Sequence, residues 1–190
     1  MKWNFKGNGD ETSPKKTKNI YARGADDGFW LGLYFSVLFG VTVVSLSLPL
    51  LNIIAVAMAL GVPFLTYFFL RRTHVAAHGM TLFSALWIQG ITMFACGCLI
   101  FGAVSFTYLR WIDPEFLVRV LRMGVEFYNA SDAEGAQMLA SEFQMIIDSK
   151  VLPVASDVVF GWMWLGMFSG SILSMFIAAI VRLRKVKHPV

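Results

Sequence analysis

The stretch FWLGLYFSVLFGVTVVSLSL at residues 29–48, followed by Pro49 and then by LLNIIAVAMALGVPFLTYFFL at residues 50–70, decides the fold. Neither run contains a charged residue. Each is long enough to cross the hydrocarbon core of a bilayer, which takes about 20 apolar residues of helix. Because almost no chain is left between the two runs for a loop, their helices must be antiparallel. The sequence therefore predicts a membrane protein that begins with a tight helical hairpin.

Two further apolar stretches, at residues 82–109 and 151–181, are predicted as the third and fourth spans. Both exceed the length that a bilayer requires, so we expect tilt or protrusion. The predicted fold class is an all-α integral membrane four-helix bundle that occupies residues 29–181. Residues 1–28 are polar and are predicted as a flexible cytoplasmic tail, because they are too long and too polar for the start of a cleavable signal peptide. Residues 182–190 are predicted as a basic cytoplasmic tail.

The composition of the 190 residues agrees with this class. Hydrophobic residues make up 57% of the chain and charged residues only 15%, whereas a soluble domain is about one quarter charged. An ordinary soluble enzyme and an intrinsically disordered chain are both excluded by these values. The net charge of +4 is interpreted as a signal of membrane topology, and we expect no nucleic-acid partner.

The positions of the basic residues predict the orientation. Twelve of the 16 Lys and Arg residues lie in the two tails and in the connection between spans two and three, which four spans place on one side. Seven of the twelve acids lie in the connection between spans three and four, on the other side. Because basic loops stay in the cytoplasm, both termini are predicted to be cytoplasmic.

The connection at residues 113–150 is predicted as an extracytoplasmic amphipathic helical hairpin. Asp113, Pro114 and Glu115 are typical of a helix start, with Asp113 as the N-cap. The first helix then has one apolar face at helical spacing, made of Leu117, Val120, Leu121, Gly124, Phe127 and Tyr128. A second helix follows and ends near Lys150. The segment carries too many charges to cross the bilayer.

Three polar residues within or beside the spans are candidates for a functional site. A carboxylate at the bilayer centre costs about 3 kcal/mol on insertion scales, so Asp157 is a functional candidate by default. Asp157 is also placed to cap the start of span four, and Asn52 at a similar depth is placed to donate a hydrogen bond to it. Gln89 is expected to form a hydrogen bond between helices, worth about 1 kcal/mol.

No residue pattern predicts a catalytic, metal or cofactor site. His74 and His78 are four residues apart, but no Asp, Glu or Cys lies near them to complete a metal site. Cys96 and Cys98 lie in one apolar run and are interpreted as packing residues. We therefore expect no metal ligand, no cofactor and no enzymatic activity.

Small residues recur at every fourth position along two spans. Such stripes let helix backbones approach closely in lipid. They predict that spans one and four pack together through these faces, within one chain or between two copies, unless one stripe receives a partner protein. The first stripe is Gly28, Gly32, Ser36 and Gly40, and the second is Gly166, Gly170, Ser174 and Ala178.

A family resemblance rests on the segment from Gly79 to Leu117. It contains GMTLFSALW at residues 79–87 and YLRWIDPEFL at residues 108–117. In both its motifs and its order of elements, the chain resembles a family of small four-span inner-membrane proteins of Bacteroidetes-type bacteria, the domain of unknown function DUF4199. The resemblance implies a bacterial inner-membrane location and no known activity, so it supplies no catalytic residue.

Two functions fit these features. The leading hypothesis is a non-enzymatic accessory or scaffold subunit that binds another membrane protein, or a second copy of itself, in the lipid bilayer. The alternative is a small transporter or ion-conducting oligomer that uses Asp157, Asn52 and Gln89. A membrane enzyme ranks third, because no pair of nucleophile and base can be named.

Overall fold

The computed structural model describes residues 19–184 except residue 47, residues 132–134 and residues 149–153. Most of the predicted N-terminal tail, Lys150, the predicted start of span four at residues 151–153 and the end of the C-terminal tail lie outside the described residues. The described elements, in chain order, are α1 (Ile20–Ser45), α2 (Pro49–Ala76), α3 (Phe83–Thr107), a π-helical turn η1 (Tyr108–Ile112), α4 (Phe116–Asn129), α5 (Ala136–Asp148) and α6 (Ala155–Leu183).

All the regular elements in the described part of the chain are helices, and the predicted all-α class is confirmed. Four helices are long and apolar enough to cross a membrane: α1, α2, α3 with its continuation η1, and α6. The shorter helices α4 and α5 form a hairpin between the third and fourth spans, as predicted. The chain is a multi-pass membrane protein.

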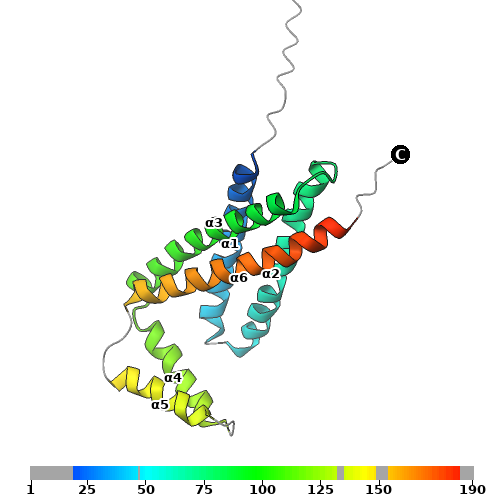
Figure 1. Cartoon of the computed structure of the whole chain (residues 1–190). Helices are drawn as coiled ribbons and strands as arrows, with labels where there is room; N and C mark the ends of the chain where they lie inside the picture. The colour runs from blue at the N-terminus through cyan, green and yellow to red at the C-terminus, as the bar shows by residue number, and fades with distance from the viewer. Residues whose placement is uncertain (1–18, 47, 132–134, 149–153, 185–190) are drawn as a thin grey trace, which may run out of the picture.

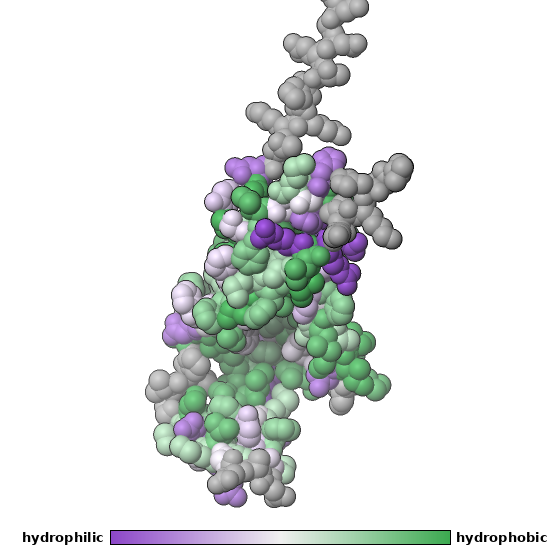
Figure 2. Space-filling view, turned by 45° about the vertical axis from the view of Figure 1, so that its right-hand side comes forward, coloured by the Kyte–Doolittle hydropathy of each residue, from purple (hydrophilic) through white to green (hydrophobic). Residues whose placement is uncertain are grey.

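Helix α3 lies at the centre of the bundle. It packs most extensively against α1 and then against α6, whereas α2 packs mainly against α1 and α6 and meets α3 only slightly. In Figure 1, α3 and α6 run side by side and cross in front of α1 and α2. We call the end where α1 begins and α6 finishes the termini end, and the end that carries α4 and α5 the hairpin end. Figure 2 shows hydrophilic residues gathered at the termini end and hydrophobic residues over the middle of the molecule.

Helix α1 begins at Ile20, nine residues before the start expected from hydropathy. A helix of 26 residues is about 39 Å long at 1.5 Å per residue, whereas the hydrocarbon core is about 30 Å thick. The extra turns carry Arg23, Asp26 and Asp27, and the excess length allows them to lie at the level of the lipid head groups. These turns are supported by α3, because a Cβ added to Gly24 would lie 2.9 Å from the Cβ of Thr92.

The first small-residue stripe packs against α3. A Cβ on Gly28 would lie 2.7 Å from the carbonyl oxygen of Met93, and a Cβ on Gly32 would lie 2.9 Å from the carbonyl oxygen of Gly97. Both distances are shorter than real contacts, so glycine is required where α1 and α3 cross. The stripe does not continue in this role, because Gly40 has no atom within 4 Å of its would-be Cβ. Ser36 donates a hydrogen bond to the Gly32 carbonyl within its own helix, at 2.8 Å.

The second stripe, on α6, packs against α3 as well. A Cβ on Gly170 would overlap the ring of Phe94, and one on Gly166 would lie 2.9 Å from Sγ of Cys98. Ser174 is buried against Gly90 of α3, and Ala178 is buried in the core. The prediction that spans one and four pack together within one chain is therefore wrong: each stripe faces α3, which lies between them.

The bundle has two hydrophobic clusters. The larger lies in the half nearer the termini end and contains Leu31, Leu70, Leu86, Met93 and Phe94 among its buried members. The smaller lies at the hairpin end and joins Leu109, Phe116 and Val159. Beside this second cluster the ring of Phe39 packs against those of Phe116 and Tyr108, with ring centroids 6.1 and 5.5 Å apart. The first turn of α4 is thus anchored to the bundle.

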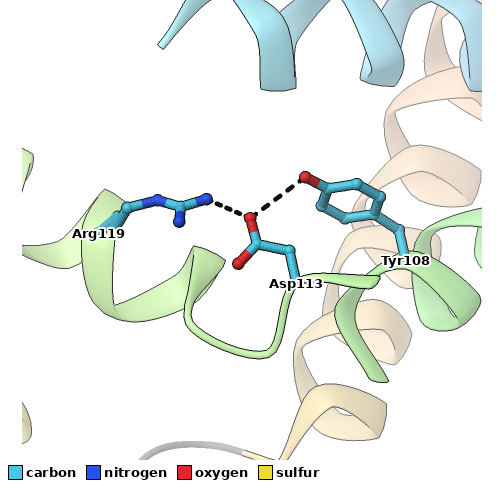
Figure 3. A network of polar contacts seen from close by, with 3 residues as sticks. All are labelled: Tyr108, Asp113 and Arg119. Carbon is cyan, nitrogen blue, oxygen red and sulfur yellow. Dashed lines mark hydrogen bonds and ion pairs between the residues drawn. The ribbon is translucent and has the colours of Figure 1, made fainter. Parts of the chain in front are cut away.

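Asp113 connects the end of the third span to α4 with its side chain. Its carboxylate accepts hydrogen bonds from the hydroxyl of Tyr108, at 3.2 Å, and from the guanidinium of Arg119 (Figure 3). The structure therefore corrects the predicted N-cap. Helix α4 begins at Phe116, two residues later than Pro114 suggested, and its N-cap position is Glu115. The π-helical turn η1 explains the difference, because the amide of Asp113 donates to the Tyr108 carbonyl, at 2.9 Å, and so still belongs to that turn.

Candidate functional site

The strongest polar feature near the termini end joins three helices. Gln89 of α3 donates through Nε2 to Oδ2 of Asp27 on α1, at 3.0 Å, and to Oγ1 of Thr73 on α2, at 2.8 Å. All three side chains are buried. We call this group the polar triad. Helices α1 and α2 are thereby each joined to α3 by a directional hydrogen bond, which for α2 supplements a slight packing contact.

Gln89 is 0% exposed, and this value determines how its amide acts. Both amide hydrogens are used, since one reaches Asp27 and the other reaches Thr73. Its carbonyl oxygen Oε1 is buried without a hydrogen-bond partner among the described atoms. Leaving such an acceptor unpaired costs about 1–3 kcal/mol. The unpaired Oε1 therefore lowers the stability of the bundle, and the hydrogen bond from Nε2 to the carboxylate of Asp27 offsets part of this loss.

Basic side chains lie near the carboxylate of Asp27. Arg72 of α2 and Arg23 of α1 are the cationic groups near it, and Asp26 is the neighbouring acid. These groups line a cleft of about 570 Å³ on the outer side of the polar triad, together with Thr73, Ala76, Phe29 and Trp30. We call it the termini-end cleft. Among the described residues, neither Arg23 nor Arg72 forms a salt bridge.

The two histidines do not form a pair. His74 lies in the last turn of α2, is buried, and shares a short hydrogen bond with the hydroxyl of Thr81. His78 lies beyond the end of α2 with a φ of 53°, in the left-handed region, so the helical stacking of positions four apart does not apply. Over the ranges that the structure describes, no three His, Cys, Asp or Glu side chains are grouped as a metal would require.

The half of the bundle nearer the hairpin end contains a second, apolar feature. A groove of about 440 Å³ opens between α1, α3 and α6 and reaches the first turns of α4. We call it the aromatic groove. The hydroxyl of Thr42 in its wall already donates to the Leu38 carbonyl, at 2.9 Å. The other lining residues include Phe35, Leu38, Phe39, Phe101, Phe116, Trp162 and Gly166.

The polar candidates are not brought together. Asp157 is exposed in the first turn of α6, where a negative charge is favoured by the helix dipole, and its carboxylate accepts a hydrogen bond from the hydroxyl of Ser156, at 3.4 Å. Asn52 is exposed near the start of α2. In the described part of the chain no hydrogen bond joins Asn52 to Asp157, and Gln89 bonds instead to Asp27 and Thr73.

Comparison with known protein families identifies the family of this chain. The model of the family described as a protein of unknown function (DUF4199) matches residues 27–183. The chain belongs to this family. The match to DUF4199 includes all three members of the polar triad and every residue that lines the aromatic groove. The comparisons with curated proteins and with solved structures found no match.

Sequence reasoning identified Gln89 but missed both of its partners. Asp27 was assigned to the polar tail, because a hydropathy window ends at Phe29. A signal was present all the same: Gly24 extends the stripe of Gly28 and Gly32 by one step in the N-terminal direction, so the packing face of α1 begins before its apolar run. Thr73 comes directly after Arg71 and Arg72. Its hydrogen bond with Gln89 joins two different helices, so no local sequence pattern predicts it.

Proposed function

We propose that this chain is a non-enzymatic membrane module that binds one transmembrane helix of another membrane protein in its aromatic groove. The observation that carries the proposal is the groove itself, which lies in the half of the bundle nearer the hairpin end and is lined mainly by Phe, Trp and Leu side chains. Transmembrane helices associate by close van der Waals packing, and small residues allow the backbones to approach. Gly166 supplies such a residue in the wall of the groove.

The dimensions and chemistry of the groove favour a helix. On α1 and its C-cap the lining residues run from Phe35 to Leu46, which is about three helical turns. Because the Thr42 hydroxyl is already bonded within α1, the groove offers little to a polar substrate. The transporter alternative has less support, since Asp157 and Asn52 are exposed and Gln89 is bonded within the polar triad.

Site-specific photo-crosslinking in native membranes tests this proposal. A benzophenone side chain at Leu38, inside the groove, should yield a discrete adduct with one protein. The same side chain at Val37, which is exposed and does not line the groove, should yield at least about fivefold less of that adduct. Equal yields at the two positions, adducts with lipid alone, or an adduct only with a second copy of this chain would each contradict binding of a separate partner.

We also propose that both termini face the cytoplasm of a bacterial cell and that the hairpin of α4 and α5 lies outside it. The distribution of Lys and Arg supports this orientation. A membrane-impermeant thiol reagent applied to intact cells should label Ala130→Cys in the hairpin. It should label Met80→Cys, between α2 and α3, only after the cells are opened. The unmodified chain, with Cys96 and Cys98 inside α3, provides the background, and the reverse pattern would invert the topology.

A further inference from the structure

We propose that the termini-end cleft binds the head group of an aminophospholipid such as phosphatidylethanolamine. In this arrangement the guanidinium groups of Arg23 and Arg72 hold the phosphate, and the carboxylates of Asp26 and Asp27 accept hydrogen bonds from the primary ammonium. The inference is independent of the proposed partner helix, because the cleft and the aromatic groove have no lining residue in common.

The position of the cleft supports a lipid head group. Arg23 and Arg72 lie in the terminal turns of α1 and α2, which extend beyond the length that spans the hydrocarbon core. Other cationic side chains lie at the same end, since the guanidinium carbons of Arg71 and Arg184 lie 5.9 and 5.7 Å from the centre of the Tyr67 ring. Trp30 lines the cleft and is largely exposed, as is typical of rings that lie among head groups and glycerol.

The charges in the cleft favour a zwitterion. Two guanidinium groups and two carboxylates line it, so its formal charge is balanced. A purely anionic head group would satisfy the guanidinium groups but would place its charge beside two carboxylates. An aminophospholipid carries one charge of each sign, and each charge can face its opposite. Hydrogen bonds between such charged partners are about twice as strong as neutral ones.

The carboxylates also favour a primary ammonium over a quaternary one. A primary ammonium has three N–H donors, as a lysine side chain does, whereas a choline nitrogen has none. Asp27 is held by Gln89 at 3.0 Å from behind the cleft, so its carboxylate is already oriented by the polar triad. The triad therefore acts as a positioning group for the site.

Native mass spectrometry of the purified full-length chain in detergent tests the proposal, with phosphatidylethanolamine as the probe. We expect phosphatidylethanolamine to bind at least about tenfold more tightly than phosphatidylcholine or phosphatidylglycerol. Glycerophosphoethanolamine, which lacks acyl chains, should compete only weakly. Equal or tighter binding of phosphatidylglycerol would overturn the match to a zwitterion. Full competition by glycerophosphoethanolamine would indicate that the cleft binds a soluble phosphate compound, and it would overturn the assignment to a lipid.

Two neighbouring arginines supply a matched pair of variants. Arg72→Gln should weaken phosphatidylethanolamine binding by about tenfold, because a charge-assisted bond to phosphate is lost. Arg71→Gln removes the same charge from the adjacent position, which lies over Tyr67 and does not line the cleft, and it should leave binding unchanged. Equal losses of phosphatidylethanolamine affinity in both variants would mean that only the overall positive charge of this surface matters. That result would overturn the proposed binding site.

A variant of the exposed carboxylate tests the ammonium half of the site separately. Asp26→Asn should reduce the preference for phosphatidylethanolamine over phosphatidylglycerol by about fivefold or more, and it leaves the polar triad intact. An unchanged preference would overturn the assigned role of the carboxylates. The thermal melting temperature of each variant, measured in the same detergent, shows whether the fold is retained before binding is compared.

Discussion

Leucine in place of Gly28 should destabilise the bundle by about 3 kcal/mol or more, because overpacking a close contact costs about 1–3 kcal/mol even where neighbours can move. Here the neighbours cannot easily move. The first added carbon would lie 2.7 Å from the Met93 carbonyl oxygen and 2.8 Å from the Cβ of Cys96. The backbone of α3 would have to retreat from α1, and the contact between these helices is the largest in the molecule. Reversible unfolding in mixed detergent micelles measures the loss.

Gly40→Leu is the matched control on the same helix and in the same predicted stripe. Its would-be Cβ has no atom within 4 Å, and a leucine gains about 1 kcal/mol of helix propensity over glycine. We therefore expect stability that is unchanged or slightly raised. If the two variants have the same free energy of unfolding, the close contact between α1 and α3 at Gly28 is contradicted.

Gln89→Leu is expected to cost about 3 kcal/mol, and for a different physical reason. Leucine fills nearly the same volume, so little of the loss comes from packing. The loss arises because the buried carboxylate of Asp27 and the hydroxyl of Thr73 both lose their donor. An unpaired buried acceptor costs about 1–3 kcal/mol, and a charged acceptor costs more. The same detergent unfolding assay reports this change.

A pair of threonine variants separates the polar triad from ordinary loss of a hydroxyl. Thr73→Val removes the acceptor that Gln89 uses, and it should cost about 1–2 kcal/mol. Thr92→Val removes a hydroxyl that only bonds to the Ile88 carbonyl of its own helix, and it should be nearly neutral. Equal effects would mean that the bond between Gln89 and Thr73 contributes nothing of its own to stability.

The four spans could be predicted because their signal is local. A run of about 20 residues without charge is sufficient, whatever the rest of the chain does. The start of α1 could not be found in this way, since Arg23, Asp26 and Asp27 lower the hydropathy of turns that are nevertheless helical. Those turns are stabilised by contact between Gly24 and Thr92 of α3, which is a property of two distant segments.

Which helices pack together could not be predicted from the sequence, for a related reason. The small-residue stripes on α1 and α6 indicate that each helix has a close neighbour, but they do not identify which helix that neighbour is. The decisive residues are on α3: Gly97 faces α1 and Gly90 faces Ser174 of α6. They are seven residues apart in an apolar run, so they form no stripe at every fourth position. Likewise Gln89 was visible as a polar residue, while Asp27 became its partner only through the crossing of α1 and α3.

The central place of α3 has a consequence for biosynthesis. Helices α1 and α2 leave the ribosome first, joined by their short connection, and the glycine face of α1 then has only lipid to meet. Gln89 follows Asp27 by 62 residues, which is about 3–12 s of translation at ordinary rates. During this interval Asp27 has no amide donor, and it gains one when α3 arrives between its neighbours. The third span thus completes the nascent protein, and α6 is added to a core that already exists.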